Sequence, residues 1–386
     1  MTGAQRDRAP LPEPPVATLE DLRLSQALLR ANGATTQAGF TAERIPAQLF
    51  PHRPILFDDG PAHAEHRKQL VRYFSPRTLE LRHLGFIERV ADELVGKAQR
   101  DGRCQLDDLA LIFSVRVASE IVGLTGGSTQ DLARRLEAFF RQPPVDHTRP
   151  DHGRTQRQWA RAARDALLPL ASFYWHDVRP AIRARRARPA DDIISHLLER
   201  GYRPREILME CLTYGTAGMV TTREFISMAF LRISEMPEVR ARYLVAERTE
   251  RIAILSEIIR LEPPVAHIYR RVRNTGTGCP YPSGTLVDID VRQANTDAGV
   301  FGDDPGTVCP DRNLPAADRT GLSFGDGAHR CPGSHLALME TDVLLRALLR
   351  AEASISRPPK REFDTLVQGY QLRAFSLEFS PSASAP

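Results

Sequence analysis

The stretch Phe-Gly-Asp-Gly-Ala-His-Arg-Cys-Pro-Gly, residues 324–333, runs directly into a segment with the apolar spacing of a helix. A cysteine at a helix N-terminus meets the positive end of the helix dipole and unpaired backbone N–H groups, which stabilise a thiolate. Pro332 suits the first helical position because its φ is already helical and its missing N–H would have no partner there. The stretch therefore predicts a cradle that holds Cys331 as an anion.

The glycines of this stretch point to a metal ligand. Gly325, Gly327 and Gly333 remove side chains around the sulfur, so that backbone N–H groups can approach it and moderate its electron density. A zinc site built from His329, Cys331 and His335 is a weaker interpretation, because a closed zinc site needs four ligands and no further Cys or His lies nearby in the sequence. A buried cysteine after a Gly-rich turn is the other alternative.

The stretch resembles the haem-binding loop of the cytochromes P-450, F-G-x-G-x-H-x-C-x-G, at every fixed position. The resemblance covers about residues 18–380 and is to the soluble bacterial type. It implies that Cys331 is the axial metal ligand of haem b, iron protoporphyrin IX, and that Phe324, Gly325 and Gly333 belong to the cofactor-binding loop. The implied fold is α+β and predominantly helical, with a large helical part and small β-sheets.

A second motif lies upstream, where Glu257 and Arg260 stand three residues apart on one helix face and can pair. Such pairs are common on solvated helices, but here Pro263-Pro264-Val265 and Arg270 follow, as in the E-x-x-R region of the family. Residues 308–312 resemble the F-x-P-x-R meander, with Val308 in place of Phe. The resemblance implies a structural ion-pair network of Glu257, Arg260 and Arg312 on the thiolate side of the haem.

His63 and Arg67 are four residues apart, so they project from one helix face toward the same anion. The spacing matches the H-x-x-x-R of the family, and haem carries two propionates that need cations. The resemblance assigns propionate contacts to His63, Arg67, Arg270 and His329. For His66 we expect an exposed position at a helix start.

Residues 215–222 resemble the oxygen-binding stretch A-G-x-[D/E]-T-T, with Val220 in place of the acid. Ala217 and Gly218 are small enough for a helix to pass close to a flat cofactor. Thr221 keeps the hydroxyl that the family uses in oxygen activation. Because valine cannot relay protons, Glu224, three residues after Thr221, is the candidate relay: water ordered by Thr221 and Glu224, or a group on the substrate, would deliver the proton. Tight packing of a core helix is the alternative interpretation of this stretch.

Substrate contacts are implied by resemblance for residues 47–56, 212–216, 265–269 and 368–372. The predicted pocket residues are Thr216, Val265, His267, Ile268 and Tyr269. His267 and Tyr269 either give the pocket polar groups or are satisfied within the core.

Composition sets the outer limits of these interpretations. With 386 residues, 42% hydrophobic and 26% charged, the chain falls in the globular range, and we expect a single haem domain over residues 1–386 with a flexible segment 1–16. Lys and Arg exceed Asp and Glu by only four, 52 against 48, so no nucleic-acid partner is indicated. Five cysteines without C-x-x-C spacing favour a reducing, cytoplasmic environment. The N-terminal stretch predicts neither a signal peptide nor a membrane anchor.

The periodicity of the chain predicts a helix with its N-cap at Thr18 that ends at Gly33, and a long, interrupted helical region over 63–259. Strands are predicted within 281–291 and 366–379, separated by a loop over 302–319 and a helix over 332–349.

The resemblance implies a haem-thiolate monooxygenase that inserts one oxygen atom from dioxygen into a small organic substrate, as in secondary metabolism. Electrons from NAD(P)H would come through a ferredoxin and a ferredoxin reductase. Two alternatives stay open. The missing acid favours atypical oxidation, such as aromatic coupling or nitration, and a non-catalytic haem-binding sensor would need no oxygen-activating Thr221.

Overall fold

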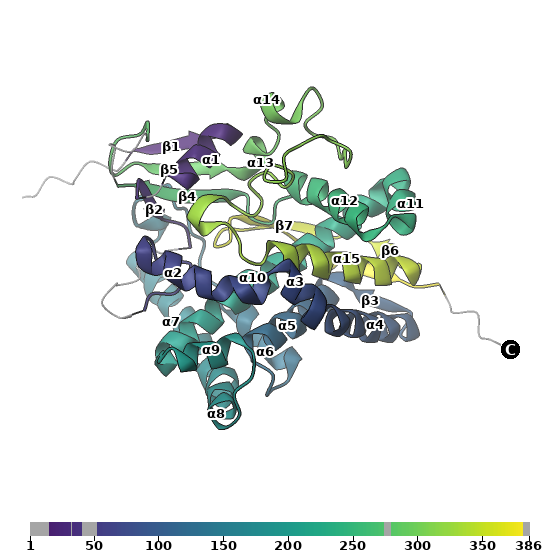
Figure 1. Ribbon diagram of the computed structural model, residues 1–386, viewed down its shortest axis with the longest axis horizontal. Helices are drawn as coiled ribbons and strands as arrows, with labels where there is room; N and C mark the ends of the chain where they lie inside the picture. Colours follow the sequence, from purple (N-terminus) through teal and green to yellow (C-terminus); the bar gives the residue numbers. More distant parts are fainter. Residues whose placement is uncertain (1–14, 32, 41–51, 274–278, 381–386) are drawn as a thin grey trace, which may run out of the picture.

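The computed structural model describes residues 15–31, 33–40, 52–273 and 279–380. Helices make up most of it, with small sheets among them (Figure 1), so the predicted α+β, predominantly helical class is confirmed. The α-helices are α1 Leu22–Arg30, α2 Pro61–Leu70, α3 Pro76–Thr78, α4 Leu84–Arg100, α5 Leu106–Val122, α6 Thr129–Ala138, α7 Gln156–Phe173, α8 Arg179–Ala187, α9 Ile193–Glu199, α10 Pro204–Glu235, α11 Pro237–Val245, α12 Arg248–Leu261, α13 Val291–Ala294, α14 Ala298–Phe301 and α15 Ser334–Arg350. Short 3₁₀ or π turns are η3 Val71–Phe74, η4 Leu79–His83, η5 Pro150–Gly153, η6 Tyr174–Val178 and η8 Gly327–His329.

The strands form a four-stranded sheet of order β1-β5-β4-β2, a three-stranded sheet β3-β9-β6 and the hairpin β7-β8. Their bounds are β1 Val16–Leu19, β2 Thr35–Gln37, β3 Arg103–Gln105, β4 His267–Val272, β5 Leu286–Asp290, β6 Ser354–Arg357, β7 Lys360–Asp364, β8 Gly369–Arg373 and β9 Ser376–Glu378. In the four-stranded sheet, β1 runs parallel to β5, whereas β2 and β5 both pair antiparallel with β4. The register places Gln37 opposite Arg270, so β2 lies beside a residue that is predicted to contact the haem propionates.

Helix α10 runs through the centre of the helical part (Figure 1) and packs against α5 and α15. Its second half, from Arg223 to Leu231, is buried at every position, as expected for a helix surrounded by other helices. Its middle differs, because Ala217 and Gly218 are exposed between half-buried Thr216 and buried Met219. The helix that the sequence assigns to oxygen binding is therefore a core helix with one open spot.

The periodic regions of the sequence are confirmed at the level of whole elements. Helices α2 to α12 fill the predicted helical region, strand β5 lies within 281–291, and β8 and β9 lie within 366–379. In the part of the chain that the structure describes, no helix combines the length and apolarity needed to cross a membrane.

Two predicted helix starts are wrong. Thr18 is not an N-cap but lies in β1, and α1 begins after Asp21, whose carboxylate accepts the N–H of Leu24 at 2.7 Å. Pro332 is not the first residue of its helix, because α15 begins at Ser334 with Gly333 as its N-cap. In both cases a tertiary contact decides the boundary: β1 pairs with β5, and a backbone bond from the N–H of Cys331 to the carbonyl of Phe324 at 2.8 Å closes the loop before the helix.

The N-terminal helix ends at Arg30, three residues before the predicted Gly33, which has a left-handed φ of 76° in the following turn. The expected flexible segment 1–16 lies outside the described residues except for its last two, and Val16 belongs to β1, paired with Leu286.

Candidate haem site

The sulfur of Cys331 lies at the end of a closed loop, just before α15. Gly325 and Gly327 both have left-handed φ, 65° and 64°, so the loop needs glycine at these two turns. A side chain at Gly327 would also collide with α1, since its Cβ would lie 2.0 Å from the carbonyl oxygen of Leu29. Burial raises the pKa of the Cys331 thiol, whereas the N–H of Gly333 and the charges of Arg67 and Arg330 act to lower it. The loop thus surrounds the sulfur with the donors and cations that a bound thiolate requires.

The four residues predicted to contact the propionates come together from three separate parts of the chain. The rings of His63, on α2, and His329, in the loop, stack with their centroids 4.2 Å apart and an angle of 17° between the planes. Arg67, one turn along α2, donates to the carbonyl of Arg330. Arg270, on β4, is buried and donates to the hydroxyl of Thr35 at 3.0 Å.

A residue that the sequence analysis missed joins this group. Asp59 accepts from His329 Nε2 at 2.9 Å and lies 3.5 Å from an Nη2 of Arg270. Asp59 lies four residues before His63, whereas His329 is 270 positions away in the chain, so spacing gave no signal for this contact.

Two observations show that the described residues fit a haem. The Nε2 atom of His63 is buried, and no hydrogen-bond partner is found for it among the described residues, which is costly unless a further acceptor is bound. Across the site, a Cβ added to Gly218 would meet nothing within 4 Å, although this residue lies in the middle of a core helix. An unpaired donor at the cation end and open space beside α10 are what a flat, dianionic cofactor between these elements would fill.

The distal stretch of α10 departs from the predicted proton relay. Val220 is buried, and Thr221 Oγ1 donates to the carbonyl of Ala217 at 2.5 Å. Glu224 is also buried, and its carboxylate is used within the protein: it accepts from Arg223 Nε at 2.9 Å, from Arg373 Nη2 at 2.8 Å and from the backbone N–H of Leu372 at 3.2 Å. These contacts tie α10 to β8, so the geometry favours a structural role for Glu224 over the predicted relay.

His66 is not exposed, contrary to expectation. It is buried on α2 with Nδ1 3.8 Å from Oε1 of Glu210, a buried acid of α10. Burial lowers the pKa of His66 to about 4 and raises that of Glu210 to about 8, so both are neutral in between. This pair could not be predicted from the sequence, because nothing in the residue spacing of α2 indicates that His66 faces Glu210 of α10.

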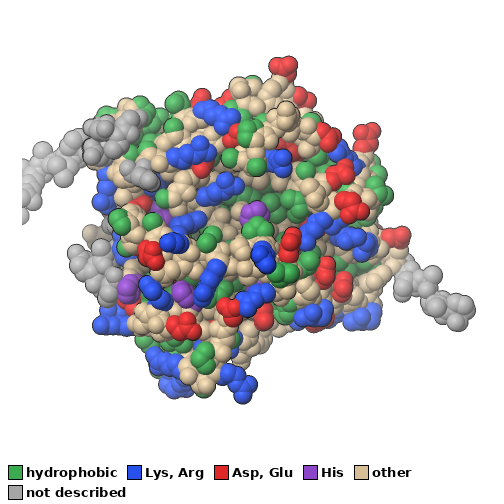
Figure 2. Space-filling view, in the orientation of Figure 1, with side chains coloured by type: hydrophobic (Ala, Val, Ile, Leu, Met, Phe, Trp, Pro, Cys, Tyr) green, Lys and Arg blue, Asp and Glu red, His purple; other side chains and the backbone are tan. Residues whose placement is uncertain are grey.

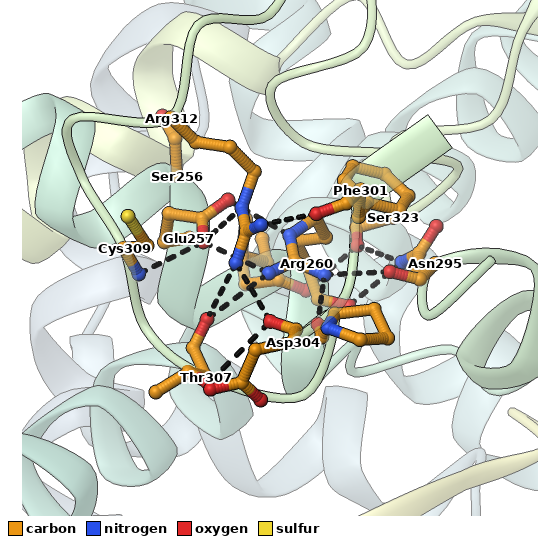
Figure 3. Close-up of polar contacts among 12 residues, drawn as sticks. Ser256, Glu257, Arg260, Asn295, Phe301, Asp304, Thr307, Cys309, Arg312 and Ser323 are labelled. Atoms are coloured by element: carbon orange, nitrogen blue, oxygen red, sulfur yellow. Dashed lines mark hydrogen bonds and ion pairs between the residues drawn. The ribbon is translucent and has the colours of Figure 1, made fainter. Parts of the chain in front are cut away.

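The structure joins Glu257, Arg260 and Arg312 in one buried network (Figure 3). Arg260 makes two bonds of 2.8 Å to the carboxylate of Glu257 and also donates to the backbone carbonyls of Asn295 and Pro305, at 2.6 and 2.8 Å. Arg312 Nε lies 3.5 Å from Oε2 of Glu257. The network fastens the loop after α14 to α12, directly upstream of the Cys331 loop.

The substrate segments predicted around residues 265–269 and 368–372 lie against each other. The N–H of Ala266 donates to the carbonyl of Gln368 at 2.7 Å, and the hydroxyl of Tyr269 donates to the side chain of Gln368 at 3.3 Å. Gly369 is pressed against this segment, since a Cβ there would lie 1.8 Å from the carbonyl oxygen of Pro264.

The residues predicted to line the substrate pocket do not all lie in one place. His267 bonds through Nδ1 to Asp288 at 2.9 Å, and Thr216 donates its hydroxyl to the carbonyl of Leu212 at 2.8 Å. Ile268 packs against the hydrophobic cluster around α1 and β5, apart from His267 and Tyr269, because alternate strand residues point to opposite faces. Val265 is half-buried. Residues 47–51 of the first predicted substrate segment lie outside the described residues.

Comparison with known proteins supports the same assignment. Residues 252–360 match the family model "Cytochrome P450". Cytochrome P450 144 of Mycobacterium tuberculosis is 27% identical over 78% of this chain, a match that spans 66% of that relative's length. The erythromycin C-12 hydroxylase of Saccharopolyspora erythraea is 29% identical over 85% of this chain and 81% of its own. A solved structure of a mutant of P450 EryK in complex with erythromycin B has a TM-score of 0.77 at 25% identity, covering 96% of this chain and 92% of that one.

The fold, the group of His63, Arg67, Arg270 and His329, and the Cys331 loop together fit a haem-binding protein. The matched segment, the similar relatives and the similar solved structure are all bacterial cytochromes P450 or match their family model, and the cofactor of that family, haem b, fits the site described above.

Proposed function

We propose that the protein is a haem-thiolate monooxygenase that inserts one oxygen atom of dioxygen into a small organic molecule. The observation that carries this is the pairing of two features: the Cys331 loop and the open spot at Ala217 and Gly218 beside the hydroxyl of Thr221. When bound, a haem with an anionic sulfur ligand supplies the redox chemistry that splits dioxygen. A sensor would need the first feature but not the second.

The protein's own residues would hold the cofactor and organise its surroundings. Cys331 would provide the sulfur ligand, kept anionic by the Gly333 N–H and by Arg67 and Arg330. His63, Arg67, Arg270 and His329 would bind the propionates. Thr221 would present its hydroxyl at the open spot and order water there, while Ala217 and Gly218 leave the room that dioxygen and substrate need.

For the substrate, we propose a scaffold of secondary metabolism, aromatic or polyketide-like. Relatives named the erythromycin C-12 hydroxylase and the cyclomarin C epoxidase CymV are each 29% identical to this chain and support this class. The walls of the pocket would be the Thr216 region of α10 and the joined segments 265–269 and 368–372.

For the electrons, we propose delivery by a ferredoxin and its reductase in the cytoplasm. The face of the molecule that carries α2, α3 and α15 bears many Lys and Arg side chains (Figure 2), among which Arg72 and Arg77 are exposed. Such a surface complements an acidic electron carrier and would steer its approach.

The test uses Cys331→Ser with Cys309→Ser as the matched control. Reduced wild-type protein exposed to carbon monoxide should show the strongly red-shifted Soret band of thiolate ligation, and Cys309→Ser should keep it, whereas Cys331→Ser should lose it. Turnover then needs a surrogate ferredoxin, its reductase, NADPH, oxygen and a panel of macrolide and aromatic compounds, with products followed by mass spectrometry. A red-shifted band without oxygenated product from any compound that shifts the haem spin state would favour the sensor.

A second candidate function, aromatic coupling or nitration, is favoured by a specific observation. Val220 replaces the acid, and Glu224 is engaged by Arg223 and Arg373, so this part of α10 offers no free carboxylate among the described residues. Chemistry that consumes fewer delivered protons suits such a site better. Val220→Asp should raise the ratio of oxygenated product to NADPH consumed if monooxygenation is the native reaction, and should leave a coupling or nitration yield unchanged.

A further inference from the structure

Asp59 lies among the four residues proposed to bind the propionates, His63, Arg67, Arg270 and His329, although it carries the same charge as the propionates. Its Oδ1 accepts from His329 Nε2 at 2.9 Å and lies 3.5 Å from Arg270 Nη2. Its Oδ2 is held from the other side by the backbone N–H of Gln37 at 3.3 Å. One carboxylate therefore connects β2, the segment before α2, β4 and the Cys331 loop.

The turn at the start of α2 fixes the position of the Asp59 carboxylate. Gly60, the N-cap of α2, has a left-handed φ of 84°, and Pro61 follows as the first helical residue. A side chain at position 60 would strain this turn, since only glycine adopts such a φ readily. The turn fixes Asp59 immediately before the helix that carries His63 and Arg67.

The two side chains that Asp59 contacts, Arg270 and His329, keep nitrogens for another anion. Arg270 donates from Nε to Thr35 at 3.0 Å, from Nη1 to Gln37 at 2.9 Å and from Nη2 to the carbonyl of Thr35 at 3.4 Å. A guanidinium has five N–H donors, so with the Asp59 contact one N–H of Nη1 is left over. In His329 the contact uses Nε2 and leaves Nδ1, which is a second N–H donor when the ring carries both protons, while stacking on His63 fixes the ring plane.

We infer that Asp59 is a positioning residue for the haem propionates, which orients the His329 ring and the Arg270 guanidinium from behind so that their remaining donors face the cofactor. This inference rests on the haem site described above and deepens it. Metal-binding histidines are oriented by carboxylates in the same manner, and loss of such a partner typically weakens binding 10- to 100-fold.

The opposing effect is charge repulsion between Asp59 and the two propionates. If repulsion dominated, removing the carboxylate would strengthen haem binding. Orientation and repulsion therefore predict changes of opposite sign, and the rate of haem loss distinguishes them.

The experiment measures transfer of haem from the purified holoprotein to excess apomyoglobin, for wild type, Asp59→Ala, Asp59→Asn and Asp58→Asn. Asp59→Ala should lose haem about tenfold faster or more. Asp59→Asn, which keeps an oxygen acceptor for His329, should lie between Asp59→Ala and wild type. Asp58→Asn is the matched control, because the hydrogen bonds to His329 and Arg270 come from Asp59, whereas Asp58 accepts the backbone N–H of Asp59 and acts on His329 only through its charge; it should stay within twofold of wild type.

A second readout separates positioning from general loss of fold. The haem circular dichroism in the Soret region reports the orientation of the cofactor and should change in Asp59→Ala, while the far-ultraviolet spectrum stays that of wild type. Haem loss at or below the wild-type rate in Asp59→Ala, or equal acceleration in Asp58→Asn, would overturn the inference. Absence of haem or of the red-shifted band in the wild type would instead refute the proposed function, independently of Asp59.

Discussion

Buried polar atoms have hydrogen-bond partners around Arg260, whereas several of those on α2 and α10 have none among the described residues. Arg260 is fully buried, yet its guanidinium is bonded to Glu257 and to backbone carbonyls, and stacks 4.4 Å from the ring centroid of Phe301. Nε2 of His66 and Oε2 of Glu210, between α2 and α10, and Nε2 of His63, beside His329 of the Cys331 loop, are buried with no hydrogen-bond partner among the described residues. A satisfied network fixes structure, whereas unpaired buried atoms mark where a ligand or water is expected.

The largest effect is expected from breaking the satisfied network. Arg260→Met removes both 2.8 Å bonds to the buried Glu257 carboxylate and leaves it, among the described residues, only the longer contact with Arg312 and the Cys309 N–H, and breaking a buried pair in this way typically costs about 3–5 kcal/mol of unfolding free energy. Urea unfolding of the holoprotein measures it. Arg242→Gln, which removes an exposed ion pair with Asp311, is the control and should change the midpoint little. A small loss in Arg260→Met would mean that the network is dispensable.

The Glu224 carboxylate has hydrogen-bond partners, like that of Glu257, although Glu224 lies on α10 with Glu210, whose Oε2 has no partner among the described residues. Glu224→Gln weakens charge-assisted bonds to Arg223 and Arg373, with an expected loss of about 1–3 kcal/mol. Glu235→Gln, in an exposed pair with Arg232, should cost much less. Because we assign Glu224 a structural role, the solvent isotope effect on turnover should not change. A changed isotope effect with unchanged stability would restore the proton relay.

Glu210, one of the residues with an unpaired buried atom, should make the unfolding free energy depend on pH. Its pKa in the folded protein is raised to about 8 from 4.5, so the folded state keeps a proton that the unfolded chain loses, and its contribution to stability falls as pH rises from 4.5 to 8. His66, with a pKa lowered to about 4, opposes this below pH 6.5, which leaves pH 6.5–8 to Glu210 within this pair. Glu210→Gln should therefore flatten the fall in unfolding free energy over that range. Parallel curves for variant and wild type would contradict this.

The smallest effect is expected at the open spot of α10. Gly218→Ala meets no neighbour, so it should stabilise the haem-free protein by about 1 kcal/mol through helix propensity, while it slightly weakens haem uptake. Gly126→Ala, in an open surface turn, is the control for haem uptake. Unchanged haem binding in Gly218→Ala would place the cofactor away from this residue.

What the sequence predicts well are contacts within one element and motifs that stand on a single turn. His63 and Arg67 share a face of α2 because four residues make about one turn, and Glu257 pairs with Arg260 for the same reason. Contacts between residues far apart in the chain leave no pattern in the local sequence and could not be predicted. The partner of Glu224 is Arg373, and that of His329 is Asp59, separated by 149 and 270 positions, so only the folded chain reveals them.

Element boundaries failed where pairing overrode local preference. Thr18 has the chemistry of an N-cap, but parallel pairing of β1 with β5 draws it into a strand, and the helix starts at the next suitable residue, Asp21. Pro332 suits a first helical turn, yet the loop needs two more residues to complete its closure around the sulfur. A helix does follow both Thr18 and Pro332, as predicted, but each helix begins later in the chain than predicted.

The locked segments at Ala266 and Gln368 have a consequence for engineering. Because a backbone bond of 2.7 Å, the Tyr269 hydroxyl and the close approach of Gly369 to Pro264 hold them together, neither segment can shift without the other. Substitutions placed in both should therefore be strongly non-additive, and libraries that randomise one stretch at a time would miss most of the accessible selectivities.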